Sequence, residues 1–350
     1  MKVRLFAAAT LLCLISNLVL AAQGPRTKIN SPVVLKARGA RLVPMLPATD
    51  GIVTLDAKRL TTDGLPRILA ANPTLSAKIT GHFDDILAKT GIDLRKFDEV
   101  AVGLNLVSKG RKGVNTYGVA LASGDINAAA FVAVAKLASR GAYSQEEIAG
   151  RTVYVFNSPD IANRATAPTG TVAMIDQGLE HMTASIAVAA YDANLLVVGN
   201  EPLVRETLLG KSHPSVQLTA LLDRNPAAIL NFAIKTPAGL DGLLPLGNDE
   251  LGKNLRSIQY ISGSADETGA GASLSVAART ARPEQAQGVK ATLDGLQMMG
   301  TAMLGASPKP ANQAYSRMLK SAKFVQTGNE VTLDLLIPQA DINTLISGLH

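Results

Sequence analysis

The histidines of this chain are the side chains best suited to metal binding and to acid–base chemistry at neutral pH. The chain has four of them: His82, His181, His213 and His350. None lies three or four residues from another on a predicted helix, or two residues away on a predicted strand. Zinc sites usually draw ligands from such local pairs, so the sequence predicts no metal centre.

Two carboxylates that converge on one bond could supply a general acid and a general base. Asp98 and Glu99 are adjacent at the start of a predicted strand, so their side chains point to opposite faces. Asp125 directly precedes a predicted helix, where a carboxylate acts as the N-terminal cap. The sequence therefore predicts no catalytic carboxylate pair.

Motifs of nucleotide-binding and nucleophilic enzymes do not occur in the chain. It has no Gly-x-x-x-x-Gly-Lys-Ser/Thr, no Gly-x-Ser-x-Gly and no Ser-x-x-Lys. Gly269 and Gly271 lie in a predicted hairpin turn, where glycine is needed for the backbone conformation. No catalytic, cofactor-binding or metal-binding residue is predicted, and a nucleophile assembled from distant segments stays open.

Two turns carry weaker signals for binding. Gly199–Asn200 precede a predicted helix whose backbone N–H groups could hold an anion. Glu201 already supplies negative charge in the first turn, so a helix cap is the favoured interpretation. Lys109, Arg111 and Lys112 lie at a predicted hairpin tip and indicate a solubilising edge or, alternatively, a partner contact.

Three methionines, Met298, Met299 and Met303, lie on a helix predicted to begin at Pro283. Methionine side chains adapt to irregular apolar partners. One interpretation is therefore an apolar surface for a ligand or partner. The other, which the spacing favours, is that these side chains belong to the core.

The elements that position these residues centre on residues 97–156. Apolar residues alternate from Val100 to Leu106 and again from Tyr117 to Leu121, which predicts a hairpin of two strands. An Ala-rich helix from Ile126 to about Ser139 and a strand at Val153–Val155 follow. Gly51–Asp56 is predicted to be an earlier strand.

This order of elements recurs about 158 residues later. Residues 227–232 match 51–56, Ile258 follows Val100 by 158 positions, and Leu240–Leu244 echo an earlier short helix. We therefore predict an α+β fold of two similar units, residues 50–210 and 211–350, each an antiparallel sheet with helices packed on one face. The predicted inner faces hold Val100, Val102, Leu104, Val119 and Leu121 in the first unit and Ile258, Tyr260, Leu274 and Val276 in the second.

The N-terminus has the three parts of a signal peptide, which we assign to residues 1–21. Lys2 and Arg4 precede an apolar run that ends in Val19–Ala21. An uncleaved anchor is disfavoured because an 18-residue run is at the short limit for a membrane span. The single cysteine, Cys13, lies in this segment, so the mature chain has no disulfide. These features predict an extracytoplasmic protein, periplasmic or secreted, without a transmembrane helix after processing.

Charge is distributed unevenly along the chain. Seven of the 34 Lys and Arg residues and none of the 28 Asp and Glu residues precede residue 50, so residues 50–350 have a net charge of −1. Residues 22–49 are predicted to be a flexible basic tail, with weak contact to an anionic envelope surface as the alternative role. A neutral body excludes nucleic-acid binding as the expected function. The absence of tryptophan and an aromatic content of 4% disfavour sugar sites.

Leu195–Val204, Gly124–Asp125 and the closing strand Val331–Pro338 together resemble uncharacterised extracytoplasmic bacterial proteins. The resemblance implies a secreted α+β protein without known catalysis. It transfers no functional residue to this chain.

The sequence leaves three functions open. The favoured one is a non-enzymatic extracytoplasmic binding or interaction protein, with an unknown protein or an apolar ligand as its partner. The alternatives are a carrier of an apolar small molecule and a hydrolase with a dispersed site. The binding surface is predicted at the junction of the two units together with residues 157–184, a long loop that is either functional or disordered.

Overall fold

The computed structural model describes residues 41–108, 114–156, 185–236 and 250–347 of the 350-residue chain. Several predicted features lie outside the described residues. These are the signal peptide, residues 22–40 of the tail, Lys109, Arg111, Lys112, the 157–184 loop, the helix at Leu240–Leu244, His181 and His350.

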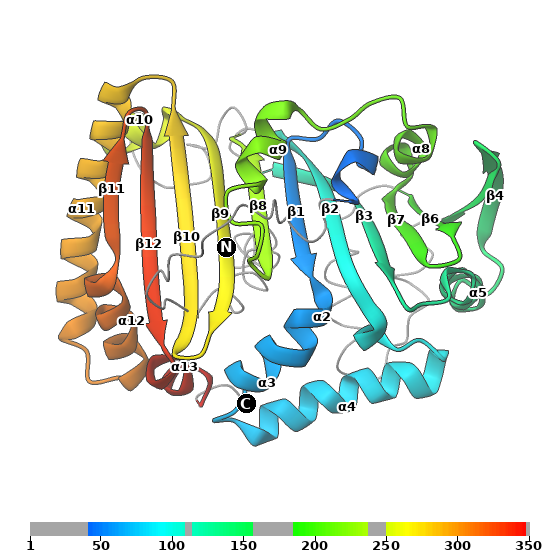
Figure 1. Ribbon diagram of the computed structural model, residues 1–350, viewed down its shortest axis with the longest axis horizontal. Coiled ribbons are helices and arrows are strands. Elements are labelled where there is room, and N and C mark those ends of the chain that lie inside the picture. The colour runs from blue at the N-terminus through cyan, green and yellow to red at the C-terminus, as the bar shows by residue number, and fades with distance from the viewer. Residues whose placement is uncertain (1–40, 109–113, 157–184, 237–249, 348–350) are drawn as a thin grey trace, which may run out of the picture.

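A twelve-stranded antiparallel sheet forms the centre of the described part of the protein (Figure 1). Its strand order is β11-β12-β10-β9-β8-β1-β2-β3-β7-β6-β5-β4. The strands are β1 (Gly51–Asp56), β2 (Phe97–Ser108), β3 (Val114–Gly124), β4 (Tyr143–Ile148), β5 (Arg151–Phe156), β6 (Ile186–Asp192), β7 (Leu195–Asn200), β8 (Leu230–Lys235), β9 (Ile258–Thr268), β10 (Gly271–Thr280), β11 (Lys323–Thr327) and β12 (Glu330–Pro338).

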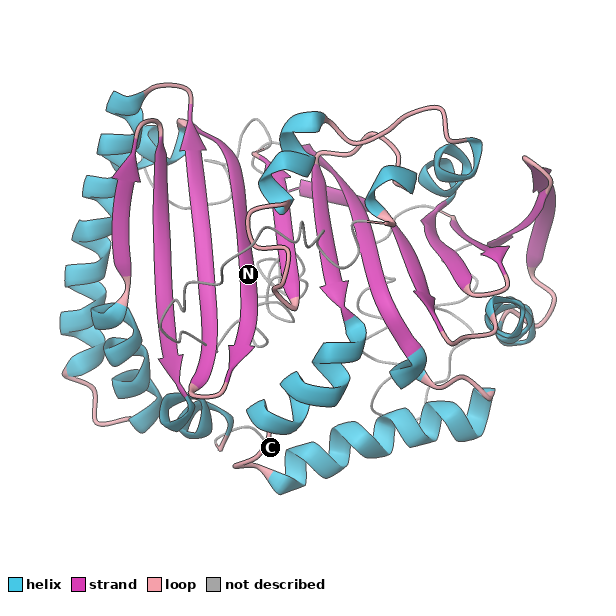
Figure 2. Ribbon diagram, in the orientation of Figure 1, coloured by secondary structure: helices cyan, strands magenta, loops and turns pink. Residues whose placement is uncertain are grey.

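Helices flank this sheet at its ends and along one border (Figure 2). The α-helices are α2 (Ala57–Arg59), α3 (Leu65–Ile68), α4 (Pro73–Thr90), α5 (Ala128–Ala138), α8 (Glu201–Leu209), α9 (Val216–Leu222), α10 (Glu250–Arg256), α11 (Pro283–Gly305), α12 (Pro310–Ser321) and α13 (Gln339–Ile346). Short 3₁₀ turns occur at η1 (Val43–Met45) and η3 (Leu94–Lys96), and the π-turn η2 (Leu60–Gly64) joins α2 to α3. In the described part of the chain, no helix is long and apolar enough to cross a membrane.

The two halves of the chain share part of their strand order, although β4 and β5 have no counterpart among the described strands of the second half. In each half three strands pair in sequence, β1-β2-β3 and β8-β9-β10, and a later hairpin returns so that its second strand, β7 or β12, pairs with the third strand. A helix then follows that returning strand, α8 in one half and α13 in the other. The predicted α+β class is confirmed. The halves are joined into one sheet because β1 and β8 pair with each other, from Gly51 opposite Ile234 to Leu55 opposite Leu230.

The register of the first hairpin corrects the predicted inner face. Val119 lies opposite Gly103 and Leu121 opposite Ala101. Directly opposed residues share a face of the sheet, so Val119 and Leu121 lie on the face of Ala101, which we call face A. Val100, Val102 and Leu104 lie on the other side, face B. The alternation in each strand is local, whereas its phase relative to the next strand depends on the turn between them.

The same error affects the second hairpin. Leu274 lies opposite Ala265 and Val276 opposite Gly263, whereas Tyr260 lies opposite Arg279. Leu274 and Val276 are therefore on face B and Tyr260 is on face A. Ile258 lies beyond a register irregularity and packs against α11 together with Val289.

Helices cover both faces of the sheet, and the prediction of one covered face is corrected accordingly. On face A, Leu203 of α8 and Leu218 of α9 pack in the cluster that contains Ala101. On face B, α5 packs through Val132, and α10 to α13 cover the second half. Face A of the first half is apolar and is therefore buried under helices. On β9 to β12 the same face carries small and polar residues. Examples are Ser262, Ser264, Ser275 and Asp334.

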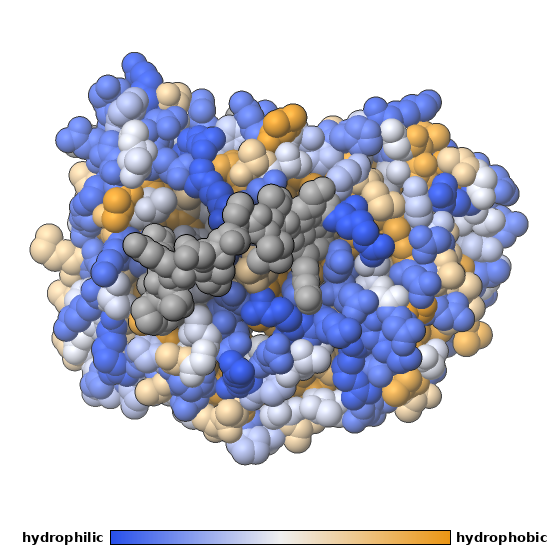
Figure 3. Space-filling view, viewed as in Figure 1, coloured by the Kyte–Doolittle hydropathy of each residue, from blue (hydrophilic) through white to orange (hydrophobic). Residues whose placement is uncertain are grey.

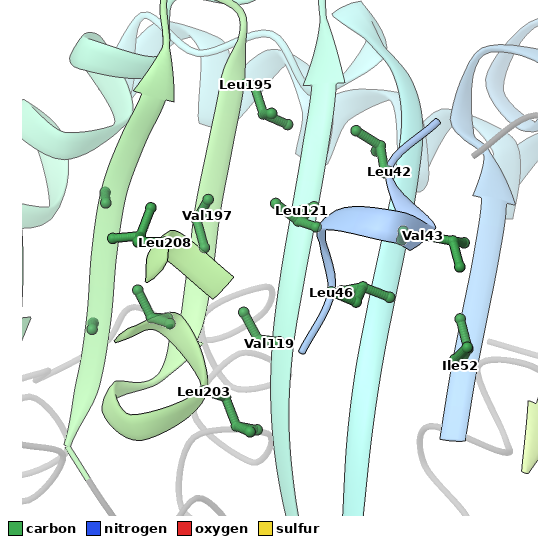
Figure 4. Packing of buried hydrophobic residues seen from close by; sticks show 14 of the residues in the cluster. Leu42, Val43, Leu46, Ile52, Val119, Leu121, Leu195, Val197, Leu203 and Leu208 are labelled. Carbon is green, nitrogen blue, oxygen red and sulfur yellow. The ribbon is translucent and has the colours of Figure 1, made fainter. Parts of the chain in front are cut away.

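Residues 41–49 belong to the fold and correct the predicted extent of the basic tail. Leu42 is 1% exposed and Leu46 0% exposed, and both lie in the face A cluster beside Leu121 (Figure 4). The 3₁₀ turn η1 places these side chains over β2 and β3. The charge pattern that suggested a linker ends at Arg41, and the apolar residues after it fill a gap in the core.

Candidate interaction surface and polar pocket

The residues with metal-binding chemistry stay apart in the structure. His82 lies on α4, and Nδ1 of His213 lies 2.9 Å from the carbonyl oxygen of Pro44. Among the described residues, no three His, Cys, Asp or Glu side chains are grouped so that they could hold a metal ion.

The acidic candidates have structural partners. Asn127, and not Asp125, caps α5 by accepting a hydrogen bond from the Ala130 N–H. Asp125 instead pairs with Lys96 at 2.9 Å, which raises the pKa of that lysine. The predicted cap was therefore wrong by two positions, because α5 begins at Ala128 rather than at Ile126.

Asn200 occupies the N-cap position of α8, but its side chain has another role. Its Oδ1 accepts a hydrogen bond of 2.7 Å from the Gly118 N–H on β3, and the residue is buried. Glu201 accepts from the Ser185 hydroxyl at 2.6 Å. The predicted helix boundary is confirmed, and Asn200 serves as a link between strand and helix rather than as an anion site.

The methionines of α11 are exposed, so the prediction that they belong to the core is wrong. Met298, Met299 and Met303 are 73%, 55% and 69% exposed, and Leu296 is 38% exposed. The buried side of α11 is formed earlier in the helix by Ala286 and Val289. Four exposed apolar side chains within eight residues form what we call the methionine surface, and Figure 3 shows pale orange atoms projecting at the margin of the molecule over α11.

α12 packs closely on the other side of α11 and fixes this surface. A Cβ atom on Gly300 would lie 3.0 Å from Leu319, and one on Gly305 would lie 3.1 Å from the Ser316 hydroxyl. The Gln297 amide donates hydrogen bonds to the carbonyl oxygens of Leu319 and Ala322, at 2.6 and 2.8 Å. Small residues and these hydrogen bonds hold α11 and α12 together. The methionine surface therefore lies on the side of α11 that faces away from α12.

The acidic residues of the α11–α12 hairpin, Glu284 and Asp294, lie in the first part of α11, where Asp294 pairs with Lys290 at 2.6 Å. Residues 295–323 contain four basic residues, Lys309, Arg317, Lys320 and Lys323, and no acidic residue. Arg317 is paired with the buried Asp341. In the described part of the chain, the three lysines form no ion pair. An apolar surface is thus accompanied by unneutralised positive charge.

A second candidate is a polar pocket of about 490 Å³ at the end of β3. It is lined by Arg41, Asp98, Ser123, Gly124, Asp192, Ala193, Asn194 and Leu195. These residues come from four separate segments: the start of the described chain, β2, β3 and the β6–β7 turn. Sequence reasoning missed this pocket, because nothing in the local pattern brings residues 41, 98, 123 and 192 together.

Hydrogen bonds fix most of the polar groups in the pocket. Arg41 Nη2 donates to Oγ of the buried Ser123 at 3.0 Å. Asp192 Oδ1 accepts from the Asn194 N–H at 2.8 Å. The Asn194 side-chain amide donates to the carbonyl oxygen of Ile126 at 3.1 Å. The pocket therefore presents one guanidinium and two carboxylates, those of Asp98 and Asp192.

No protein-family model and no curated protein matches the chain. Three solved structures, crystal forms I, III and IV of TP0453, superpose on it with TM-scores of 0.42, 0.41 and 0.42. Their sequences are 9%, 10% and 11% identical to this chain. The matches cover 88%, 88% and 87% of this chain and 97%, 98% and 96% of the other. The chain is thus only distantly similar to TP0453, and a resemblance at this level carries no information about function.

Proposed function

We propose that the protein is an exported, non-catalytic binding protein that attaches to an anionic membrane surface of the cell envelope through the α11–α12 hairpin. The observation that carries this proposal is the methionine surface, four exposed apolar side chains on a stretch without acidic residues. Exposed apolar patches on otherwise polar proteins mark contact sites. Export rests on the N-terminal pattern, and intact-mass measurement of the exported chain is expected to show loss of about 21 residues.

The physical basis is a sum of two modest contributions. Each lysine near an anionic lipid surface contributes about 1 kcal/mol, so Lys309, Lys320 and Lys323 supply at most about 3 kcal/mol, and less where α12 holds a lysine away from the methionine surface. Full burial of one methionine side chain adds roughly 1.5–3 kcal/mol. Neither term gives stable attachment alone, whereas together they do. Outside residues 295–323, residues 50–350 have 23 basic and 28 acidic residues, a net charge of −5, so the attraction to an anionic surface is confined to this part of the molecule.

Vesicle sedimentation of the mature chain tests this proposal. Vesicles that contain phosphatidylglycerol are expected to bind the protein, and vesicles of phosphatidylcholine alone are expected to bind it much more weakly. The triple variant Met298→Gln, Met299→Gln, Met303→Gln is expected to lower the partition coefficient at least about tenfold. A matched control is Leu137→Gln with Val216→Gln, because these side chains are 80% and 83% exposed on α5 and α9 and lie outside the methionine surface.

Two results would contradict the proposal. One is equal vesicle binding by the wild type and the triple methionine variant. The other is a lack of vesicle binding together with a polypeptide partner that is retained by wild type and lost by the variant, measured by native mass spectrometry of the protein from its own envelope. That second result would assign the methionine surface to a protein partner.

An apolar cluster at the junction of the two halves keeps the carrier function as a second candidate. On face B, Val53, Leu104, Leu230 and Ala265 form this cluster across β1, β2, β8 and β9. In the described part of the chain, all its members belong to strands. A carrier is expected to release a lipid or another apolar molecule into an organic extract of the purified protein, and an extract without such a molecule contradicts it.

A further inference from the structure

We infer that the polar pocket at the end of β3 binds an α-amino acid with a cationic side chain, such as arginine or lysine, free or at the end of a peptide. The charges in the pocket carry this inference. Arg41 offers a guanidinium, and Asp98 and Asp192 offer two carboxylates. The complementary ligand has one carboxylate and two cationic groups, which is the charge set of a basic amino acid.

The guanidinium is positioned for a carboxylate. One of its nitrogens, Nη2, donates to the buried Ser123 hydroxyl at 3.0 Å, which anchors the side chain from within the fold. A guanidinium has five N–H donors in a rigid fork. In the described part of the chain, Arg41 makes no ion pair, and it is one of the residues that line the pocket. A planar carboxylate is the group that such a fork binds best.

The two carboxylates are positioned for ammonium or guanidinium groups. Asp192 Oδ1 accepts a hydrogen bond from the Asn194 N–H at 2.8 Å, which restrains the carboxylate at the pocket wall. Asp98 pairs with Lys58 at 3.4 Å, and both side chains of this pair are about half exposed or more. Exposed ion pairs of this kind contribute little, so a ligand cation can replace Lys58 at small cost.

The wall and the size of the pocket also fit such a ligand. Gly124 forms part of the wall, and a Cβ atom there would lie 2.1 Å from the carbonyl oxygen of Lys96. Glycine is required here because a side chain would run into the backbone of residues 96–98, which keeps the wall close to β2. A volume of about 490 Å³ lies within the range of small-molecule sites, roughly 300–1,000 Å³. Because the charged groups are near the surface, a Kd of about 1 mM is expected.

Calorimetric titration of the full mature chain with three probes tests each part of this charge match. L-Arginine carries all three complementary groups, agmatine lacks the carboxylate, and norleucine lacks the side-chain cation. Arginine is expected to bind at least about fivefold more tightly than either analogue. A dipeptide with N-terminal arginine and one with C-terminal arginine then distinguish a free amino acid from a peptide end.

Variants assign the binding to this pocket. Asp98→Asn and Asp192→Asn are each expected to weaken arginine binding at least about fivefold. Norleucine keeps the α-ammonium group, so its binding is expected to be weakened by one of the two variants and unchanged in the other. Asn retains the oxygen that accepts from the Asn194 N–H, so the turn is preserved. Arg41→Lys keeps the charge and is expected to weaken arginine binding while agmatine binding stays the same. Asp125→Asn is the matched control, because Asp125 pairs with Lys96 and does not line the pocket.

Three results would overturn the inference. The first is the absence of any heat of binding with arginine at about 10 mM, ten times the expected Kd. The second is agmatine binding as tightly as arginine. The third is an unchanged arginine affinity in Asp98→Asn and Asp192→Asn variants that melt at the wild-type temperature. None of these measurements depends on vesicles, so this inference and the proposed function succeed or fail separately.

Discussion

Glu330 on β12 is bound by two arginines, and its ionised carboxylate stabilises the fold at neutral pH. Arg224 binds both of its carboxylate oxygens, at 2.5 and 2.8 Å, and Arg279 Nε lies 3.2 Å from Oε2. The hydrogen bonds from Arg224 lower the pKa of Glu330 below its ordinary value. The folded pKa is thus below the unfolded one, so this stability is present above the ordinary glutamate pKa and is lost as the pH falls through the folded pKa.

The variant Glu330→Gln is expected to lose about 1 kcal/mol of unfolding free energy at pH 7, because the pair is partly open to solvent. The difference from wild type is expected to disappear at a pH below the folded pKa of Glu330, where the wild-type carboxyl is also neutral. Urea unfolding at neutral and at acidic pH measures both values. An equal loss at both pH values would show that shape, and not charge, explains the effect.

Asp266 on β9 has the opposite behaviour. Burial raises its pKa above the ordinary value, and Arg59, whose Nη2 lies 2.8 Å away, offsets only part of that shift. The folded state therefore holds this proton more tightly than the unfolded chain. Its contribution to stability decreases as the pH rises from the ordinary aspartate pKa to the raised folded pKa.

The variant Asp266→Asn is expected to remain within about 1 kcal/mol of wild type at pH 7, because the neutral amide removes the cost of a buried charge and still accepts from Arg59. In this variant, the unfolding free energy is also expected to decrease less between the ordinary aspartate pKa and the raised folded pKa of Asp266. The same urea measurements test it, and a loss well above that of Glu330→Gln at pH 7 would contradict the argument.

At the scale of single elements, the segment before β1 is a structural part of the first half. Replacing the fully buried Leu46 by alanine is expected to cost about 2–4 kcal/mol, since the cavity lies between η1 and the sheet. The exposed Val216→Ala is the control and is expected to change stability by less than about 0.5 kcal/mol. Removing residues 22–40 is expected to leave the melting temperature unchanged. Thermal unfolding of the three chains measures these effects. If Leu46→Ala were as stable as the wild type, residues 41–49 would not be part of the folded core.

The β9–β10 turn offers a matched pair of glycines. Gly271 has φ of +145°, and a Cβ atom there would lie 2.2 Å from the carbonyl oxygen of Ile337 on β12. Gly271→Ala is expected to cost about 2–4 kcal/mol through strain and displacement of β12. Gly269→Ala places its methyl group in open space and is expected to be nearly neutral. Denaturant unfolding of both variants checks this, and similar values for the two would contradict the geometry.

At the scale of the whole molecule, the shared sheet makes the two halves depend on one another. We propose that the sequence repeat divides the chain near residues 210 and 211 into two structural units that fold as one. β1 and β8 pair along five positions at the centre of the sheet, so either half alone would expose a long inner edge strand.

The full chain is therefore expected to unfold in one calorimetric transition, with van't Hoff and calorimetric enthalpies in agreement. Residues 41–210 and 211–350 produced separately are expected to aggregate, because the unpaired edges of β1 and β8 would associate with other chains. Two resolved transitions, or soluble separate halves, would show that the units are independent domains.

The sequence alone determined the features that depend on neighbours along the chain. Gly51–Asp56 was predicted to be a strand, and β1 has these ends. The N-cap of α5 was missed by two positions because Asp125 and Asn127 are both good caps, and only the start of the helix distinguishes them. Such features are local because a strand alternates and a helix is capped within a few residues.

Only the tertiary structure decided the features that depend on contacts between distant segments. The phase of one strand relative to the next placed Val102 and Val119 on different faces, and the packing of α12 against α11 left Met298 exposed rather than buried. The pocket that joins Arg41 to Asp192 exists only because the sheet brings four segments to one place. A hydrophobic pattern specifies that a side chain can be buried, whereas the three-dimensional arrangement of the elements determines whether another element covers it.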